Sequence, residues 1–151
     1  MLTTIEKVLF FQQLPLFQSV PTEALAHLSH VSEEVHASDG ETLFRPGDLA
    51  DRVYFVMRGE VELEGEHGIR GKKPAGSDVG ASALVGKAGA RRLSAHAVGQ
   101  VALLVVTRED FFEVVGEHPE LAEALLIELG NRWGADNPCS LALDLSLVAT
   151  P

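Results

Sequence analysis

The chain has 151 residues, of which 46% are hydrophobic, and a formal net charge of −10. This is the length of one ordinary domain, and the apolar fraction is sufficient for a sizeable core. The negative charge argues against contact with nucleic acid or anionic lipid, since both require a basic surface. The single cysteine, Cys139, excludes an internal disulfide, and no run of about 18 apolar residues is present to span a bilayer. We therefore expect a cytoplasmic protein that contacts neither nucleic acid nor membrane.

The N-terminal part of the chain predicts two short helices. Residues 3–13 place apolar side chains at roughly helical spacing and end before Pro15. Pro21 suits the first turn of a second helix, in which Leu25 and Leu28 share one face. Both helices precede a change in the sequence pattern.

Short strands are predicted between about residues 31 and 106, where apolar runs alternate with glycine, proline and aspartate. Gly40, Gly47 and Gly59 suit turns that require a positive φ angle. Residues 60–64 alternate glutamate with valine and leucine, which directs the apolar side chains inward and the carboxylates outward. The pattern is typical of a mainly antiparallel β-roll.

The run ALLVV at 102–106 has the length and composition of a central strand. A helix is predicted next, because Thr107 and Asp110 resemble a capping box. A longer helix with an apolar stripe is predicted from Pro119. We predict one α+β domain, an antiparallel β-roll or jelly-roll barrel flanked by helices on both sides. Its predicted parts are the domain at 1–134, the β-roll at about 31–106, two C-terminal helices at about 107–133 and a tail at 135–151.

Basic residues gather in one glycine-rich segment. Half of all Lys and Arg residues lie between 70 and 92, against a single acid, Asp78. They are Arg70, Lys72, Lys73, Lys87, Arg91 and Arg92. A solvated basic loop and a site for a small anion both account for this pattern.

Catalytic and metal-binding patterns are not found. The chain has six histidines, and His27 and His30 could share a helix face, but no further ligand follows at a suitable interval. Ser94 and His96 lack a nucleophile elbow and a placed acid. The sequence shows no P-loop and no acid–base dyad, so we expect neither an enzyme nor a metal site.

The pattern G-x-x-L-F-x-x-G-D-x-x-D-x-x-Y-F-V-x-x-G-x-V runs from Gly40 to Val61. It resembles the cyclic nucleotide-binding domain of catabolite activator proteins, protein kinase A regulatory subunits and gated channels. The resemblance covers about residues 14–133. It implies a helical lead-in at 14–28, and a hinge helix followed by a lid helix within 107–126.

In that family the nucleotide lies in a phosphate-binding cassette, which corresponds here to residues 79–97. The resemblance implies that Gly80, Ala81 and Ser82 donate backbone N–H groups to a cyclic phosphate. Arg91 stands at the position of the family's arginine, which neutralises the phosphate charge.

Two positions depart from the family's pattern. Ala81 replaces the glutamate that accepts the ribose 2′-hydroxyl, a loss of about 1.5–3 kcal/mol or roughly ten- to a hundredfold in affinity. Arg92 replaces a small residue that touches the phosphate, and could either contact a more highly charged ligand or fill the pocket. If both arginines were in extended strand, Arg91 and Arg92 would point to opposite faces.

These features predict a non-enzymatic regulatory module that binds cAMP or cGMP weakly, or another small anion, and needs no cofactor. Trp133 is either a base-stacking residue or a packing residue at the helix end. The alternative is a degenerate module that binds no nucleotide and associates with a second copy or with a parent or partner output protein. A transcription regulator is disfavoured, because the 18 residues after Trp133 are too few for a helix-turn-helix domain.

Overall fold

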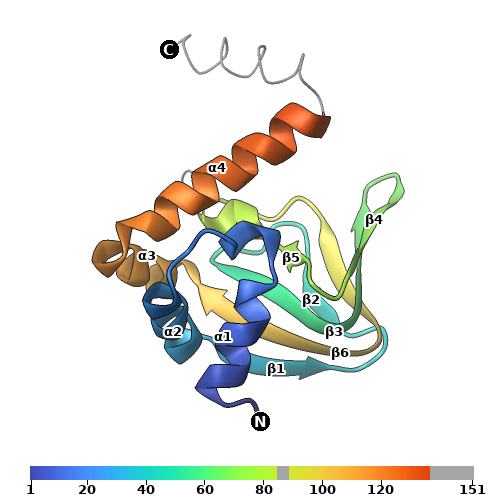
Figure 1. Ribbon diagram of the computed structural model, residues 1–151. Helices are drawn as coiled ribbons and strands as arrows, with labels where there is room; N and C mark the ends of the chain where they lie inside the picture. The colour runs from blue at the N-terminus through green and yellow to red at the C-terminus, as the bar shows by residue number, and fades with distance from the viewer. Residues whose placement is uncertain (85–88, 137–151) are drawn as a thin grey trace, which may run out of the picture.

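The computed structural model describes residues 1–84 and 89–136 (Figure 1). The helices and short 3₁₀ turns are α1 (Thr4–Gln12), η1 (Pro15–Phe17), α2 (Thr22–Val31), η2 (Ala81–Leu84), α3 (Arg108–Glu117) and α4 (Pro119–Asp136). The strands are β1 (Glu33–Ala37), β2 (Thr42–Phe44), β3 (Arg52–Gly65), β4 (Gly68–Pro74), β5 (Asp78–Val79) and β6 (Ser94–Thr107). The predicted order of helices, strands and helices is confirmed.

The six strands form one antiparallel sheet built around β3 and β6. Its main path is β1-β6-β3-β4, while β2 pairs with β6 and β5 pairs with β3. Within the described residues this path does not close, since β1 and β4 do not pair with each other. The predicted α+β class with an antiparallel β-roll is confirmed, in the form of an unclosed sheet. Gly40, Gly47 and Gly59 all adopt positive φ angles, as predicted.

Side chains alternate between two cores along the central strands. On β3, Val53 and Phe55 belong to a core shared with the helices, whereas Tyr54 and Val56 belong to a core inside the roll. The β6 run 102–106 divides in the same way. Because both faces of this part of the sheet are covered, an uninterrupted apolar run is required there. The cross-strand pairs Phe55↔Leu104 and Val56↔Leu103 keep the two faces in register.

The helices cover one side of the sheet (Figure 1). Phe11 of α1 and Phe17 of η1 meet Phe55 with ring centroids 5.3 and 5.5 Å apart. Phe111 of α3 and Leu121 of α4 are buried in the same core. The N-terminal and C-terminal helices therefore share a single apolar cluster, which fixes both sets against the sheet.

The Thr107 side chain caps α3, as the sequence predicts. Its hydroxyl accepts a hydrogen bond from the Asp110 N–H at 3.1 Å. The next residue, Arg108, donates from Nη1 to the Ala83 carbonyl at 2.7 Å. The first residue of α3 thus holds the 3₁₀ turn η2, which lies in the predicted cassette.

Candidate functional site

The predicted cassette is held by the glycine-rich turn that precedes β3. The Arg91 N–H donates to the Asp48 carbonyl at 2.7 Å, and the Gly47 N–H donates to the Arg91 carbonyl at 2.9 Å. Nearby, the Ala50 N–H donates to the Gly89 carbonyl at 2.7 Å. Gly47 and Asp48 of the Gly40–Val61 pattern therefore have a direct role at the site, because they fix the backbone of Arg91.

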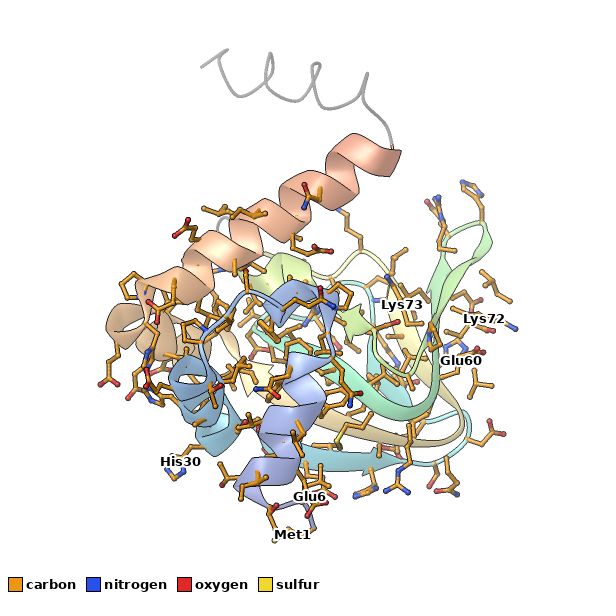
Figure 2. All side chains as sticks on the ribbon, in the orientation of Figure 1. Met1, Glu6, His30, Glu60, Lys72 and Lys73 are labelled. Atoms are coloured by element: carbon orange, nitrogen blue, oxygen red, sulfur yellow. The ribbon has the colours of Figure 1, made fainter. Side chains whose placement is uncertain are left out.

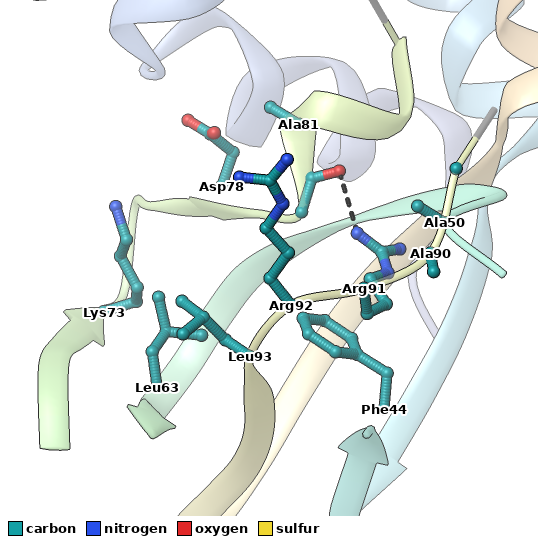
Figure 3. Close-up of a pocket in the computed structure, with 12 residues that line it drawn as sticks. Phe44, Ala50, Leu63, Lys73, Asp78, Ala81, Ala90, Arg91, Arg92 and Leu93 are labelled. Atoms are coloured by element: carbon teal, nitrogen blue, oxygen red, sulfur yellow. Dashed lines mark hydrogen bonds between the residues drawn. The ribbon is translucent and has the colours of Figure 1, made fainter. Parts of the chain in front are cut away.

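A cavity of about 610 Å³ opens beside this turn (Figure 3). Its volume is in the range of small-molecule binding sites. The lining includes four of the five predicted site residues: Gly80, Ala81, Arg91 and Arg92. The side chain of the fifth, Ser82, lies outside the described residues, as do those of 132–136 with Trp133.

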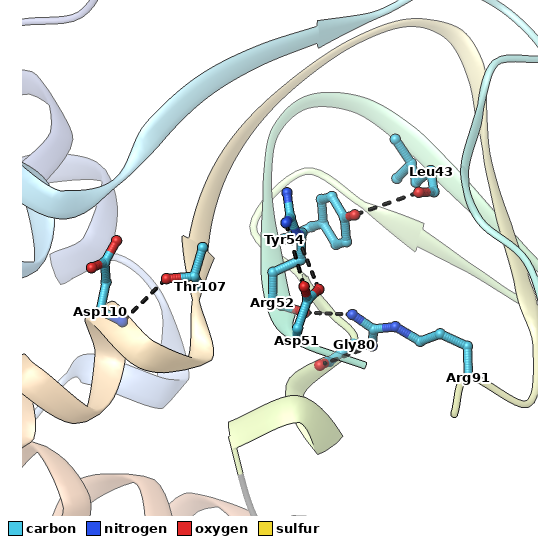
Figure 4. A network of polar contacts seen from close by, with 8 residues as sticks. All are labelled: Leu43, Asp51, Arg52, Tyr54, Gly80, Arg91, Thr107 and Asp110. Carbon is cyan, nitrogen blue, oxygen red and sulfur yellow. Dashed lines mark hydrogen bonds and ion pairs between the residues drawn. The ribbon is translucent and has the colours of Figure 1, made fainter. Parts of the chain in front are cut away.

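Arg91 is buried, with 6% of its surface exposed. Its guanidinium donates from Nη2 to the Arg52 carbonyl at 2.5 Å and from Nη1 to the Gly80 carbonyl at 3.3 Å (Figure 4). Its Cζ lies 4.2 Å from the centroid of the Phe44 ring, within the range of a cation–π contact. The buried Nε–H has no hydrogen-bond partner among the described residues. Arg91 is therefore held in place but keeps an unused donor.

In the part of the chain that the structure describes, the positive charge of Arg91 has no direct anionic partner. No carboxylate of the described residues forms an ion pair with it, and Asp51 pairs instead with Arg52, with Oδ1 and Nε 3.1 Å apart. Burial lowers the pKa of Arg91, because removal from water disfavours the charged form. Neutral carbonyls accept hydrogen bonds from its Nη1 and Nη2 without neutralising its charge. A buried cation of this kind is most stable with an anion beside it.

Gly80 makes room for Arg91. Its φ angle is +80°, and a Cβ atom at this position would collide with the Arg91 guanidinium. The Gly80 carbonyl accepts both from Arg91 and from the Ala83 N–H, the latter at 3.0 Å. A residue with a side chain would have to displace the arginine and strain the backbone. The family's glycine therefore has a local physical reason in this chain.

Arg92 is exposed and lines the same cavity as Arg91. Both arginines precede β6, which begins at Ser94, so strand alternation does not separate them. Figure 3 shows the Arg92 side chain extending toward Asp78 and Ala81, while Arg91 donates to the Gly80 carbonyl (Figure 4). Two arginines therefore reach one cavity.

Two charged residues of the cavity were not among the predicted site residues. Lys73 of β4 pairs with Val61, whose side chain is buried inside the roll, and cross-strand partners share a face. Asp78 of β5 lines the cavity beside Gly80 and Ala81. The sequence shows both residues in its basic segment, but only the β3–β4 register indicates that Lys73 faces the cavity.

The remaining lining is mostly apolar, and consists of Phe44, Ala50, Leu63, Gly89, Ala90 and Leu93. Ala81 offers a methyl group at the position of the family's glutamate. Asp78 is the only carboxylate among the described lining residues. These residues thus combine three cations, one acid and an apolar wall, a composition that suits a small anion with an apolar part.

The conserved-domain model of the cyclic nucleotide-binding domain matches residues 34–118. This is more than half of the chain. The chain belongs to the cyclic nucleotide-binding domain family. The resemblance on which the sequence interpretation relied is therefore confirmed, and the chain is a regulatory domain of this type.

Relatives and solved structures agree with this assignment. The cyclic AMP receptor protein of Thermus thermophilus is 31% identical over 137 residues, covering 87% of this chain and 61% of the relative. A CRP-like cAMP-activated global transcriptional regulator of Mycobacterium tuberculosis is 28% identical over 127 residues, covering 81% and 56%. The N-terminal domain of a Streptomyces coelicolor A3(2) transcriptional regulator superposes with a TM-score of 0.74 at 29% identity, covering 86% and 96%.

The chain spans 56% and 61% of the length of these two curated relatives. Among the described residues, none of the helices is both long enough and apolar enough to cross a membrane. The expected cytoplasmic location and the expected partners remain predictions.

Proposed function

We propose that this domain is a non-enzymatic regulatory module that binds a cyclic nucleotide, or another small anion, through Arg91. The observation that carries the proposal is a buried guanidinium beside a cavity of about 610 Å³, whose Nε–H has no partner in the part of the chain that the structure describes. An anionic phosphate oxygen would supply both the missing acceptor and the missing negative charge. The cAMP-activated regulator of M. tuberculosis supports a cyclic nucleotide as the first ligand to test.

Arg92 and Lys73 would increase the preference for anions at the same cavity. Both line it, and Arg92 is exposed, so it can move toward a ligand without breaking a buried contact. Asp78 would supply a hydroxyl acceptor in the absence of a glutamate at position 81. Because Ala81 cannot accept a hydrogen bond through its side chain, we expect weaker binding than a glutamate would give.

A regulatory role needs a route from the cavity to the rest of the domain. Arg108, the first residue of α3, donates to the Ala83 carbonyl in η2 at 2.7 Å. A ligand that shifts η2 would therefore act directly on α3, and through it on α4, which packs in the same apolar core. We propose these two helices as the output of the domain.

Isothermal titration calorimetry with cAMP and cGMP tests the proposal. We expect saturable heat with at least one nucleotide, lost in Arg91→Ala and retained in Arg70→Ala. Arg70 is exposed on β4 and is not among the residues that line the cavity, so its substitution makes the same change of charge away from the site.

Two results would contradict the proposal. Unchanged affinity in a folded Arg91→Ala variant would remove Arg91 from the site. No heat at millimolar concentration with cAMP, cGMP, 5′-AMP or inorganic phosphate would instead favour the module that binds no nucleotide and associates with another protein. Heat with 5′-AMP or phosphate alone would retain the anion site and exclude the cyclic nucleotide.

A further inference from the structure

A group of side chains with metal-binding potential lies at the other end of α3 from the cassette. It consists of His27 of α2, Glu117 at the end of α3, and His118, the C-cap residue of α3. One ligand atom of each residue lies within 4.8 Å of the others. His27 is far from the other two in the sequence, so local spacing could not have indicated the group.

The distances already approach those of a coordination shell. His27 Nδ1 and Glu117 Oε2 are 3.2 Å apart. In a tetrahedral zinc site with bonds of about 2.0–2.1 Å, neighbouring ligand atoms are about 3.3 Å apart. The His27 and His118 rings meet edge to face, with centroids 5.6 Å apart and an interplanar angle of 75°. Modest side-chain rotation would bring all three ligand atoms around one ion.

The fold holds the two histidines more firmly than the glutamate. His27 lies between the buried residues Leu25 and Leu28 on α2. The His118 N–H donates to the Val114 carbonyl at 2.8 Å, and its carbonyl accepts from the Leu121 N–H at 3.0 Å. The His27 and His118 side chains are 21% and 22% exposed, whereas Glu117 is 67% exposed. The imidazoles are therefore positioned, and the carboxylate is free to adjust.

His118 also has an outer partner. Its Nδ1 lies 3.5 Å from Oε1 of Glu120. Metal-bound histidines usually donate their second ring N–H to such a carboxylate, which orients the ring. This contact would leave Nε2 of His118 for the ion.

We propose that His27, Glu117 and His118 bind a divalent transition metal ion, best fitted by Zn²⁺. Two imidazole nitrogens and one carboxylate oxygen are ligands that Zn²⁺ prefers, with a water molecule in the fourth position. Mg²⁺ and Ca²⁺ favour sites made of oxygen ligands and are poorer candidates. Bound metal would join α2 to the corner between α3 and α4, and this proposal does not depend on the anion site.

Titration of the whole chain with ZnCl₂, followed by calorimetry and by thermal unfolding, tests the site. We expect saturable binding near one ion per chain, a rise in Tm with Zn²⁺, and no comparable effect of MgCl₂. His27→Ala and Glu117→Gln should each weaken Zn²⁺ binding at least about tenfold, and Glu120→Gln about tenfold. Glu117→Gln is a useful test because this largely exposed side chain contributes little to folding.

His30→Ala is the matched control. His30 is exposed on the same helix as His27 and projects away from the body of the domain (Figure 2). We expect the His30→Ala variant to bind Zn²⁺ with the affinity of the wild type. Absence of saturable Zn²⁺ binding, or wild-type affinity in both His27→Ala and Glu117→Gln, would overturn the proposal. The latter result would assign the binding to simpler pairs, such as His36 with Glu34 or His96 with Glu62.

Discussion

The β3–β6 pair and the part of the cassette that precedes β6 differ in what their buried positions contain. Val53, Phe55 and Leu104 are fully buried and apolar, and backbone pairing satisfies the polar groups around them. The cassette instead buries Arg91, a cation whose hydrogen-bond partners are neutral carbonyls. Apolar burial stabilises the fold. A buried charge without a counter-ion costs stability, and a bound anion would reduce that cost. The difference distinguishes a scaffold from a binding site.

Phe55→Ala should have the largest effect on stability. Phe55 is fully buried against the rings of Phe11 and Phe17, and the cavity left by truncation should cost about 3–5 kcal/mol. Arg92→Ala in the exposed part of the cassette should change the free energy of unfolding by less than about 0.5 kcal/mol. Urea denaturation of both variants checks the contrast. Equal losses would show that the cassette is part of the scaffold.

Gly80→Ala should have the next largest effect, and should act on both stability and binding. The positive φ angle alone should cost about 1–3 kcal/mol, and the new Cβ would also displace the Arg91 guanidinium. Gly76→Ala is the matched control, since Gly76 has a φ angle of +90° but open space around its Cβ position. Denaturation and nucleotide titration of the pair separate backbone strain from the Arg91 contact. Identical behaviour of the two variants would show that this contact is unimportant.

Ala81→Glu should strengthen nucleotide binding with little effect on stability. Ala81 lines the cavity, and a glutamate there could accept the ribose 2′-hydroxyl as in the family. A charge-assisted hydrogen bond should increase affinity by roughly ten- to a hundredfold. Calorimetry with cAMP and with 2′-deoxy-cAMP measures the gain and its dependence on the hydroxyl. A gain that is equal for both nucleotides would contradict the assigned position of the ribose.

Acid pH should have the smallest effect in this series. Hydrogen bonds lower the pKa of Asp51, through Arg52, and of Glu34, through the Leu2 N–H, from ordinary values of 3.8 and 4.5. Carboxylates with lowered pKa stabilise the fold above those values, and this stabilisation is lost as the pH falls through the folded-state pKa. Asp51 and Arg52 are partly exposed, so their pair should contribute less than about 1 kcal/mol.

Urea denaturation at pH 7 and pH 3 should therefore show a smaller acid loss for Asp51→Asn and Glu34→Gln than for the wild type. Asp51 lies next to Arg52, whose carbonyl accepts a hydrogen bond from Arg91, whereas Glu34 belongs to β1. An unchanged acid loss in both variants would show that other groups control the acid response.

The scaffold could be predicted from the sequence because its signals are local. Alternation along 60–64, the apolar run at 102–106 and the Thr107 cap each depend on a few adjacent residues. Gly80 and Arg91 could be indicated only through the resemblance to a family. No pattern in the sequence shows that the Gly47–Asp48 turn holds the Arg91 backbone.

The other site features depend on contacts between distant segments. Lys73 reaches the cavity because of the β3–β4 register, and Arg91 and Arg92 line one cavity because the segment is a loop rather than a strand. His27 meets Glu117 and His118 only when α2 packs against the end of α3. Local periodicity does not indicate which distant segments pack together, so these contacts could not be predicted from the sequence.

The most direct test of whether Arg91 binds the ligand phosphate is the NMR resonance of its side-chain Nε–H, followed during titration with cAMP. Its assignment comes from the signal that disappears in Arg91→Lys. We predict a saturable shift of this resonance as the Nε–H gains a phosphate acceptor, larger than the shift of the exposed Arg70 resonance. Saturable binding of cAMP that leaves the Arg91 resonance unchanged would contradict this prediction.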